Sequence, residues 1–301
     1  MKAIPKVSVV TVTYGQENFI LETIKGVLGQ RFEDSIEYII VNDNSPDNTD
    51  EIIKNYLSKT NIPSNINVKY IRHEKNKGAI PNFFWGIQQA IGEYVALCEG
   101  DDYWTDSLKL QKQVDFLEAN SDSVLCFHKV EILNESGKIV DDFITKIPDD
   151  YEDRFTLVTK LNYIHTPSVV FKNIINKELN TIEALKSPIG DYFLYIALTK
   201  YGKIGYINDT MAMYRYGVGM FSSLSTLKSI KANLLLFTNL YSFEKDVEIK
   251  EIFFEHIQEC IAQIDNEFGK LQFENSKFNE ILSSKRYKFL KKTLSYFGIT
   301  I

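Results

Sequence analysis

The feature that most limits the possible folds is the alternation of apolar, strand-like runs with helix-like segments in the first part of the chain. Each run is rich in Val, Ile or other apolar residues, as strands buried on both faces are, and a polar turn follows it. The expected strands cover residues 7–13, 37–41, 68–71 and 94–98, and the expected helices cover residues 18–29, 51–57, 82–91 and 107–119. Such repeats predict an α/β fold with a parallel, right-handed, doubly wound sheet.

Polar and aromatic residues stand where three of these strands end. Tyr14 follows the first strand, Asp43 the second, and the pair Asp101 and Asp102 the fourth. Open α/β sheets bind their ligands at this edge. Adjacent carboxylates repel each other unless a cation lies between them, so we expect Mg²⁺ or Mn²⁺ on a diphosphate. A simple polar turn, with Asp106 as the N-cap of the next helix, is the alternative.

The order of these residues suits a nucleotide diphosphate. An aromatic ring can stack on a base, the first acid can accept a base N–H, and the paired acids can hold a metal and a ribose. The first strand is not followed by Gly-x-Gly-x-x-Gly, and the chain has no Gly-Lys-Ser/Thr phosphate loop. The dinucleotide-binding and P-loop interpretations therefore lose support.

Composition narrows the partners and the compartment. The 301 residues carry a formal net charge of -6, which gives no reason to expect nucleic-acid binding. Cys98, Cys126 and Cys260 are odd in number and lack metal-ligand spacing, so we expect reduced thiols. No signal-peptide pattern opens the chain, and no apolar run approaches the roughly 20 residues that span a bilayer. We expect a cytoplasmic protein, soluble or peripheral on the inner face of the cytoplasmic membrane.

Several short motifs follow one another along this part of the chain. They are Val-Thr-Tyr-Gly at 12–15, Ile-Ile-Val-Asn-Asp-Asn-Ser-Pro-Asp-Asn-Thr at 39–49, Asn-Lys-Gly at 76–78, Asn82, and Glu-Gly-Asp-Asp-Tyr-Trp at 99–104. Together they resemble the N-terminal half of family 2 glycosyltransferases, which have the GT-A fold, and several motifs in order are more specific than one. The resemblance implies transfer of a sugar from a nucleotide-sugar donor, with inversion at the anomeric carbon.

The resemblance also implies a donor site. Tyr14 and Asp43 would hold the base, usually uracil, and Thr13 would also belong to the donor-binding residues. Gly78 and Asn82 would line the donor pocket, although an Asn at the start of a helix can equally be an N-cap.

A metal site follows from the same resemblance. Asp101 would contact the ribose or a metal-bound water, and Asp102 would coordinate Mn²⁺ or Mg²⁺, with Glu99 where Asp is usual. Arg215 would bind the diphosphate as a bidentate cation, or form a structural salt bridge. The family often has a histidine after its Tyr-Arg segment that completes the metal site, and Gly217 stands near that place here. The third metal ligand is therefore open.

The acceptor side is expected around a Gly-Asp-Tyr motif. Asp191 falls at or near the start of an apolar helix. The resemblance implies that Asp191 is the catalytic base, which takes the proton of the acceptor hydroxyl in a direct displacement. An N-cap carboxylate is the alternative. Trp104 and Tyr192 are candidate acceptor contacts, since an indole face stacks on sugar C–H groups; structural packing is the alternative for Trp104.

The C-terminal part differs in composition. We expect a GT-A catalytic domain over 1–224, with a donor half at about 1–105 and an acceptor half at about 106–224, and a helical region over 225–301. Amphipathic spacing in this region predicts helices that pack on the catalytic domain or on a second subunit of a homo-oligomer. The basic tail at 285–297 would lie on an anionic membrane, or be an ordinary terminal helix.

These expectations combine into one main function. It is an inverting glycosyltransferase of bacterial cell-envelope polysaccharide biosynthesis, which moves a sugar from a nucleotide-diphosphate donor, expected to be a UDP-sugar, to a hydroxyl of a glycan or lipid-linked oligosaccharide. A nucleotidyltransferase would need a Gly-rich basic loop where this chain has Tyr-Gly-Gln-Glu at 14–17. The other alternative is a catalytically silent partner subunit that binds a glycan or a nucleotide-sugar, which the missing histidine suggests.

Overall fold

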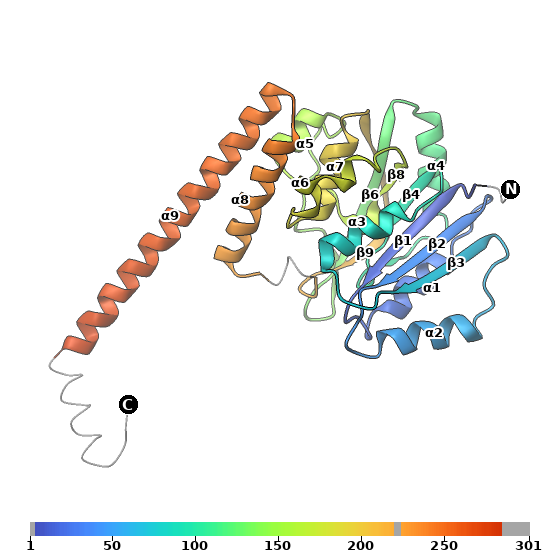
Figure 1. Cartoon of the computed structure of the whole chain (residues 1–301), viewed down its shortest axis with the longest axis horizontal. Helices are drawn as coiled ribbons and strands as arrows, with labels where there is room; N and C mark the ends of the chain where they lie inside the picture. Colours follow the sequence, from blue (N-terminus) through green and yellow to red (C-terminus); the bar gives the residue numbers. More distant parts are fainter. Residues whose placement is uncertain (1–3, 220–223, 285–301) are drawn as a thin grey trace, which may run out of the picture.

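The structure, a computed structural model, describes residues 4–219 and 224–284 and contains one large sheet with helices on both faces (Figure 1). The strands are β1 Val7–Thr13, β2 Ile36–Asn42, β3 Ile66–Arg72, β4 Tyr94–Leu97, β5 Tyr103–Trp104, β6 Ser123–Leu133, β7 Ile139–Asp141, β8 Val170–Lys172 and β9 Lys203–Arg215. The helices are α1 Ile20–Leu28, α2 Thr49–Lys59, α3 Ala79–Gln88, α4 Lys109–Ala119, α5 Arg154–Lys160, α6 Ile182–Leu185, α7 Gly190–Leu198, α8 Thr226–Phe243 and α9 Val247–Ser283, with short 3-10 helices at Thr166–Ser168 and Glu178–Asn180.

The sheet is mixed and has the strand order β3-β2-β1-β4-β8-β6-β9-β5, with β7 paired to β6. The first four strands pair in parallel, as the repeats in the sequence predict. β8 then joins β4 and β6 in antiparallel fashion, whereas β6 and β9 run parallel. The second half of the chain therefore extends the same sheet with a different connectivity.

Each face of the sheet has its own apolar core. In β1, Val7 and Val9 face the core that α1, α2 and α4 cover, and Val10 faces the core that α3, α5 and α7 cover. Successive side chains of a strand point to opposite faces, so a strand that is apolar on both faces must be buried on both. This is why the early strands read as nearly continuous apolar runs.

The helices α8 and α9 belong to the second of these cores. Ile230 and Phe237 of α8, and Ile249 and Phe253 of α9, are members of this core, and Phe243 at the end of α8 lies 4.8 Å from Phe193 of α7 between ring centroids. The helical region therefore packs on the part of the chain that contains the sheet, which agrees with one of the two expected arrangements. The division of the chain at residue 224 stays a prediction, and the basic tail expected to bind membrane lies outside the described residues.

Within the described residues, no helix is long and apolar enough to cross a bilayer.

β9 is much longer than the sequence predicts. A strand is expected only at 203–207, because the polar pair Asn208 and Asp209 looks like a strand end. In the structure Ile207 pairs with His128 and Thr210 pairs with Lys129, so the polar pair forms a bulge and the strand continues. The extension carries β9 to Arg215, at the edge of the sheet where the acids lie.

Candidate active site

The site forms where the order of strands reverses. β1 lies between β2 and β4, so the chain adds β2 and β3 on one side of β1 and then crosses to the other side. Such a switch point leaves a crevice at the carboxyl ends of two neighbouring strands, where open α/β sheets bind ligands. Thr13 ends β1 and Glu99 follows β4, so both stand at this crevice.

The loop after β1 is fixed to the loop after β2. The backbone N–H of Gly15 donates to Oγ of Ser45 at 3.0 Å, and that of Gln16 donates to Oγ1 of Thr49 at 3.0 Å. Gly15 has a φ of +68°, which glycine adopts without strain. The side chain of Tyr14 is 51% exposed at this bend, so its ring is available to stack on a base.

The carboxylate of Asp43 holds the loop that precedes α3. Its two oxygens accept the backbone N–H groups of Lys77 at 2.8 Å and Gly78 at 3.0 Å. The structure thus brings Asp43 and Gly78 together, as the predicted donor site requires, and gives Asp43 a positioning task that the sequence did not indicate. Each carboxylate oxygen has a second lone pair, so Asp43 can also accept a base N–H.

Asn82 lies inside α3 and is not its N-cap. The helix begins at Ala79, with Gly78 in the capping position. Asn82 is buried, and its Oδ1 lies 3.0 Å from Nε2 of His73, which follows β3. The N-cap alternative is therefore wrong, and the role of Asn82 in the donor pocket stays a prediction.

Three carboxyl groups gather after β4. One oxygen from each of Glu99, Asp101 and Asp102 lies within 4.8 Å of the others. Burial, with the charges of Asp101 and Asp191, raises the pKa of Glu99 to about 8. Burial also raises the pKa of Asp101, and burial with the charge of Asp101 raises the pKa of Asp102 well above its usual range. Such a cluster fits a divalent cation, because a cation relieves the repulsion.

Two polar atoms beside the acids have no hydrogen-bond partner among the described residues, namely Oγ1 of Thr13 and Oε1 of Gln16. Both lie against Gly100, where a Cβ would come within 2.3 Å of the Gln16 atom and 2.9 Å of the Thr13 atom. Glycine is therefore needed for the acids to approach β1 this closely. Buried polar groups are normally hydrogen-bonded, so a bound ligand is the expected partner of these two atoms.

Arg215 ties the acids to the end of β9. Its backbone N–H donates to Oδ1 of Asp102 at 2.8 Å. Its guanidinium donates to the backbone oxygen of Asp101 and to the carboxylate of Glu22 on α1, and it lies over two aromatic rings at 4.7 and 4.9 Å. The structural salt bridge, one of two expected roles, is thus present. Binding of a diphosphate by Arg215 stays a prediction.

Asp191 is the second residue of α7, near the helix N-terminus as expected. Its Oδ2 accepts hydrogen bonds from Nδ2 of Asn162 at 3.1 Å and from Oγ1 of Thr166 at 3.4 Å. Burial raises the pKa of Asp191, because its charged form loses hydration. Its charge in turn raises the pKa of Glu99, so Asp191 and the acid cluster belong to one site.

The structure leaves neither Trp104 nor Tyr192 free to contact an acceptor. Trp104 is 4% exposed; its indole N–H donates to the backbone oxygen of Pro167 at 2.9 Å, and Nζ of Lys109 lies 4.2 Å from its ring centroid. Tyr192 is 2% exposed, and its hydroxyl donates to the backbone oxygen of Leu157 at 3.0 Å. Both rings are packed in the interior. The expected acceptor contacts do not fit this structure, and packing is the role of Trp104.

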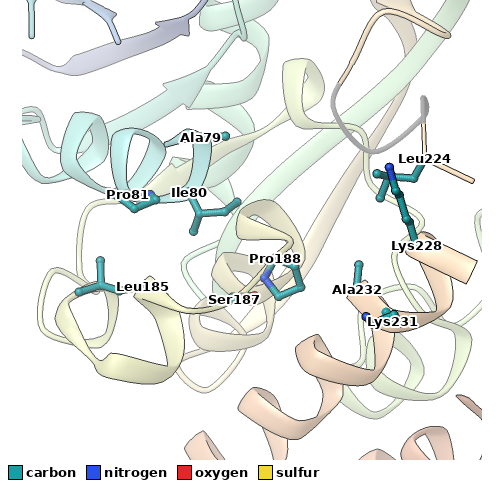
Figure 2. Close-up of a pocket in the computed structure, with 10 residues that line it drawn as sticks. All are labelled: Ala79, Ile80, Pro81, Leu185, Ser187, Pro188, Leu224, Lys228, Lys231 and Ala232. Atoms are coloured by element: carbon teal, nitrogen blue, oxygen red, sulfur yellow. The ribbon is translucent and has the colours of Figure 1, made fainter. Parts of the chain in front are cut away.

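A pocket of about 530 Å³ opens beside the start of α3, the turn before α7, and α8 (Figure 2). Its lining is mostly apolar, with Lys228 and Lys231 of α8 as its basic members. Ile80 lines the pocket and also lies close to the start of α7. A Cβ placed on Gly190, the first residue of α7, would lie 3.3 Å from Cδ1 of Ile80. The lining residues are Ala79, Ile80, Pro81, Leu185, Ser187, Pro188, Leu224, Lys228, Lys231 and Ala232.

Comparison with protein-family models matches residues 8–179 to glycosyl transferase family 2. This chain belongs to that family. The matched segment contains the switch point and all three acids of the cluster. Asp191 and Arg215 lie beyond it.

Proteins of several microbes have related sequences. An uncharacterized protein of Mycobacterium tuberculosis is 37% identical over 210 residues, which are 69% of this chain and 58% of that protein. An uncharacterized glycosyltransferase of Methanocaldococcus jannaschii is 31% identical over 220 residues, 70% of this chain and 71% of that protein. TuaG of Bacillus subtilis, a putative teichuronic acid biosynthesis glycosyltransferase, is 29% identical over 220 residues, 70% and 79% of the two chains. This chain thus spans little more than half the length of the mycobacterial relative.

Solved structures show the GT-A fold that the sequence predicted. TarS of S. aureus in complex with UDP-GlcNAc matches with a TM-score of 0.60 and 19% identity, over 85% of this chain and 71% of that chain. The mannosyltransferase PcManGT of Pyrobaculum calidifontis, in complex with GDP-Man and Mn²⁺, matches with a TM-score of 0.60 and 13% identity, over 98% and 85%. Identities this low support the fold alone.

Sequence reasoning on this family 2 protein missed the residues that hold Asp191. The loop before β8 contains His165, which attracts attention as a possible ligand, but its Nε2 lies 2.9 Å from Oδ2 of Asp142. The neighbouring Thr166 and the earlier Asn162 reach Asp191 instead. Neither residue stands in a periodic pattern, so only the common occurrence of Asn and Thr as carboxylate partners could have suggested them.

Lys109, which lies over the buried ring of Trp104, provides a test of the protein interior next to the site. Burial lowers the pKa of its ammonium group to about 7 from 10.5. Between these two pH values the unfolded chain binds more protons than the folded protein, so the free energy of unfolding gains up to about 1.4 kcal/mol per pH unit as pH rises. Lys109→Met removes this gain. The free energy of unfolding of the wild type should therefore rise relative to that of the variant from pH 7 to 9.5. Urea unfolding measures both curves, with Lys129→Met as an exposed control; parallel wild-type and Lys109→Met curves would contradict the assignment.

Proposed function

We propose that this protein is an inverting glycosyltransferase that moves a sugar from a nucleotide-diphosphate donor to an acceptor hydroxyl. The observation that carries the proposal is the acid cluster of Glu99, Asp101 and Asp102 at the switch point, with Asp191 close enough for its charge to act on Glu99. A diphosphate-binding metal site and a general base are the two parts that a direct displacement needs. Membership of glycosyl transferase family 2 supports the same reaction class.

The acids would hold Mn²⁺ or Mg²⁺. A carboxylate oxygen from each of three residues within 4.8 Å fits the oxygen preference of these ions. Gly217 has no side chain to offer, and its φ of +88° is a conformation that a histidine adopts only with strain. We infer that Glu99 takes the place of the absent ligand. A bound cation would offset the charge of the departing diphosphate.

The donor nucleotide would lie across the ends of β1 and β2. Tyr14, after β1, presents an exposed ring for stacking, and Asp43, after β2, holds the loop of Gly78. The unpartnered oxygens of Thr13 and Gln16 would accept hydrogen bonds from hydroxyl groups of the nucleotide-sugar. A UDP-sugar is our first choice, since TarS was solved with UDP-GlcNAc; GDP-Man in PcManGT makes a guanine donor the competing choice.

Asp191 would act as the base. The acceptor oxygen forms its bond to the anomeric carbon while its proton moves to the Asp191 carboxylate, and the bond from that carbon to the diphosphate oxygen breaks. Hydrogen bonds from Asn162 and Thr166 orient the carboxylate. A raised pKa makes Asp191 a stronger proton acceptor than an exposed aspartate, which favours proton transfer in the transition state.

The acceptor would approach through the pocket beside α7. Its apolar lining fits a hydrocarbon chain, and Lys228 and Lys231 fit phosphate groups (Figure 2). A glycan carried on a lipid phosphate or diphosphate combines both features. We therefore propose a lipid-linked acceptor, whose sugar would reach Asp191 while its lipid occupies the pocket.

A silent binding subunit is the second candidate, and the missing histidine at Gly217 favours it. Such a protein would bind the nucleotide-sugar without breaking it. Release of UDP from UDP-GlcNAc, or of GDP from GDP-mannose, by the purified protein distinguishes the two candidates. Slow metal-dependent hydrolysis supports an enzyme, whereas tight binding without hydrolysis or transfer supports the silent subunit.

Asp102→Asn should weaken metal-dependent donor binding. The amide oxygen can still accept the Arg215 N–H, so the main loss is the charge. Calorimetric titration with UDP in Mn²⁺ should show an affinity about tenfold lower, equal to about 1.4 kcal/mol, with little change in EDTA. Asp106→Asn is the control, because Asp106 pairs with Lys112 outside the cluster. Unchanged Mn²⁺ dependence in Asp102→Asn would remove Asp102 as a ligand.

Asp191→Asn should retain donor binding and lower donor hydrolysis or transfer by about 10²- to 10⁴-fold. Asp153→Asn provides the matched control, because Asp153 caps α5 by accepting the Phe155 N–H at 3.0 Å. A residue that only caps a helix would lose thermal stability and keep its rate. Asp191 is not the base if its variant behaves like the Asp153 variant.

The lysines of the pocket can be tested with farnesyl diphosphate as a probe. Replacing both Lys228 and Lys231 by Ser should weaken its binding about tenfold at low salt, because two charge-assisted contacts to phosphate are lost. Lys245→Ser, just after the opposite end of α8, should leave the affinity unchanged. Equal affinities in fluorescence competition for wild type and the double variant would place the acceptor elsewhere.

A further inference from the structure

Apolar residues, with one exception, recur along the sequence of α9 at alternating spacings of three and four residues. The positions are Phe254, Ile257, Ile261, Ile264, Phe268, Leu271, Asn275, Phe278 and Leu282. This is the a and d pattern of a heptad repeat, sustained over about four heptads. Its one polar member, Asn275, stands at an a position.

The first part of this pattern is partly covered by the protein itself. Phe254 contacts Tyr241 of α8, with ring centroids 6.4 Å apart, and Ile257 and Ile264 pack against the core. α8 spans 18 residues and α9 spans 37, so the antiparallel pair cannot match along the whole of α9. Figure 1 shows α9 extending past α8 and away from the sheet.

The projecting part exposes its apolar side chains. Phe268 is 61% exposed and Leu271 is 47% exposed, and Ile261 at the edge of the core is also 47% exposed. An isolated helical arm gains little from propensity alone, and most helices in proteins are stabilised by packing of an apolar face. A heptad stripe on such an arm therefore indicates a partner helix.

We propose that the α9 seam, the a and d positions from Ile261 to Asn275, pairs with the α9 seam of a second copy of this chain in a parallel, two-stranded coiled coil. A two-fold axis makes the interface self-complementary, so one sequence supplies both sides. A single Asn at an a position faces its equivalent in a parallel pair and fixes register and strand number. Asn275 provides this contact.

The residues beside the seam favour the parallel direction. In a parallel pair each g residue faces the e residue of the next heptad, so Glu267 meets Gln272 of the second copy and Glu274 meets Asn279. In an antiparallel pair with Phe268 opposite Leu271, Glu267 of each chain would face Glu274 of the other. Like charges at these positions destabilise a pair, whereas the parallel arrangement contains none there.

The full-length chain provides a matched test. Phe268 lies on the seam and Phe273 lies off it, yet the two side chains are 61% and 60% exposed. Sedimentation velocity of wild type at about 1 to 50 μM should give twice the mass of one chain. Phe268→Asp should shift the mass to that of one chain, and Phe273→Asp should remain dimeric. A wild type of single-chain mass, or equal loss in both variants, would overturn the proposal.

Direction and register can be tested by cross-linking within the seam. Leu271→Cys places a thiol at a d position, where it faces its equivalent only in a parallel, in-register pair. Mild oxidation should give a covalent dimer for Leu271→Cys and none for Phe273→Cys; Cys98, Cys126 and Cys260 are buried. Circular dichroism should show equal helicity for both variants. A non-covalent dimer that does not cross-link through Leu271→Cys would contradict the parallel arrangement.

Discussion

The repulsion among three carboxyl groups after β4, beside the end of β1, is the constraint on which the rest of the site depends. Glu99, Asp101 and Asp102 lie on one turn, too close to ionise together without a counter-charge. The chain brings Arg215 to this turn, but its guanidinium is engaged by the backbone of Asp101 and by Glu22. Arg215 therefore fixes the position of the acids. Much of their charge is left for a bound ligand to balance.

The same turn joins the two halves of the chain. Arg215 stands at the end of β9, beyond the bulge, and its backbone N–H reaches Asp102. Asp191, from α7, approaches the turn closely enough to raise the pKa of Glu99. A displacement reaction needs the leaving group and the base on opposite sides of one carbon atom. Elements distant in sequence can meet that requirement only because the second half of the chain continues the sheet of the first.

How far the sequence could predict this arrangement depended on whether the signal was local. The parallel strands, the acids at their ends and the place of Asp191 near a helix start follow from periodicity and turn residues, which act over a few positions. Trp104 and Tyr192 were assigned wrongly to the acceptor, because an aromatic residue has the same pattern whether its ring is buried or exposed. The length of β9 was missed because a bulge looks like a strand end.

The helical C-terminal part connects the proposed acceptor pocket to the proposed dimer. α8 carries Lys228 and Lys231 on the pocket wall, and Phe237 of α8 packs on Phe253 and His256 of α9 at centroid distances of 6.5 and 4.9 Å. A partner that binds only the folded form of α9 stabilises that form by mass action. The contacts with α8 lie on the core-packed start of α9, and the seam begins beyond them. Pairing through the α9 seam would therefore stabilise the projecting part of α9 without contributing any residue to the pocket.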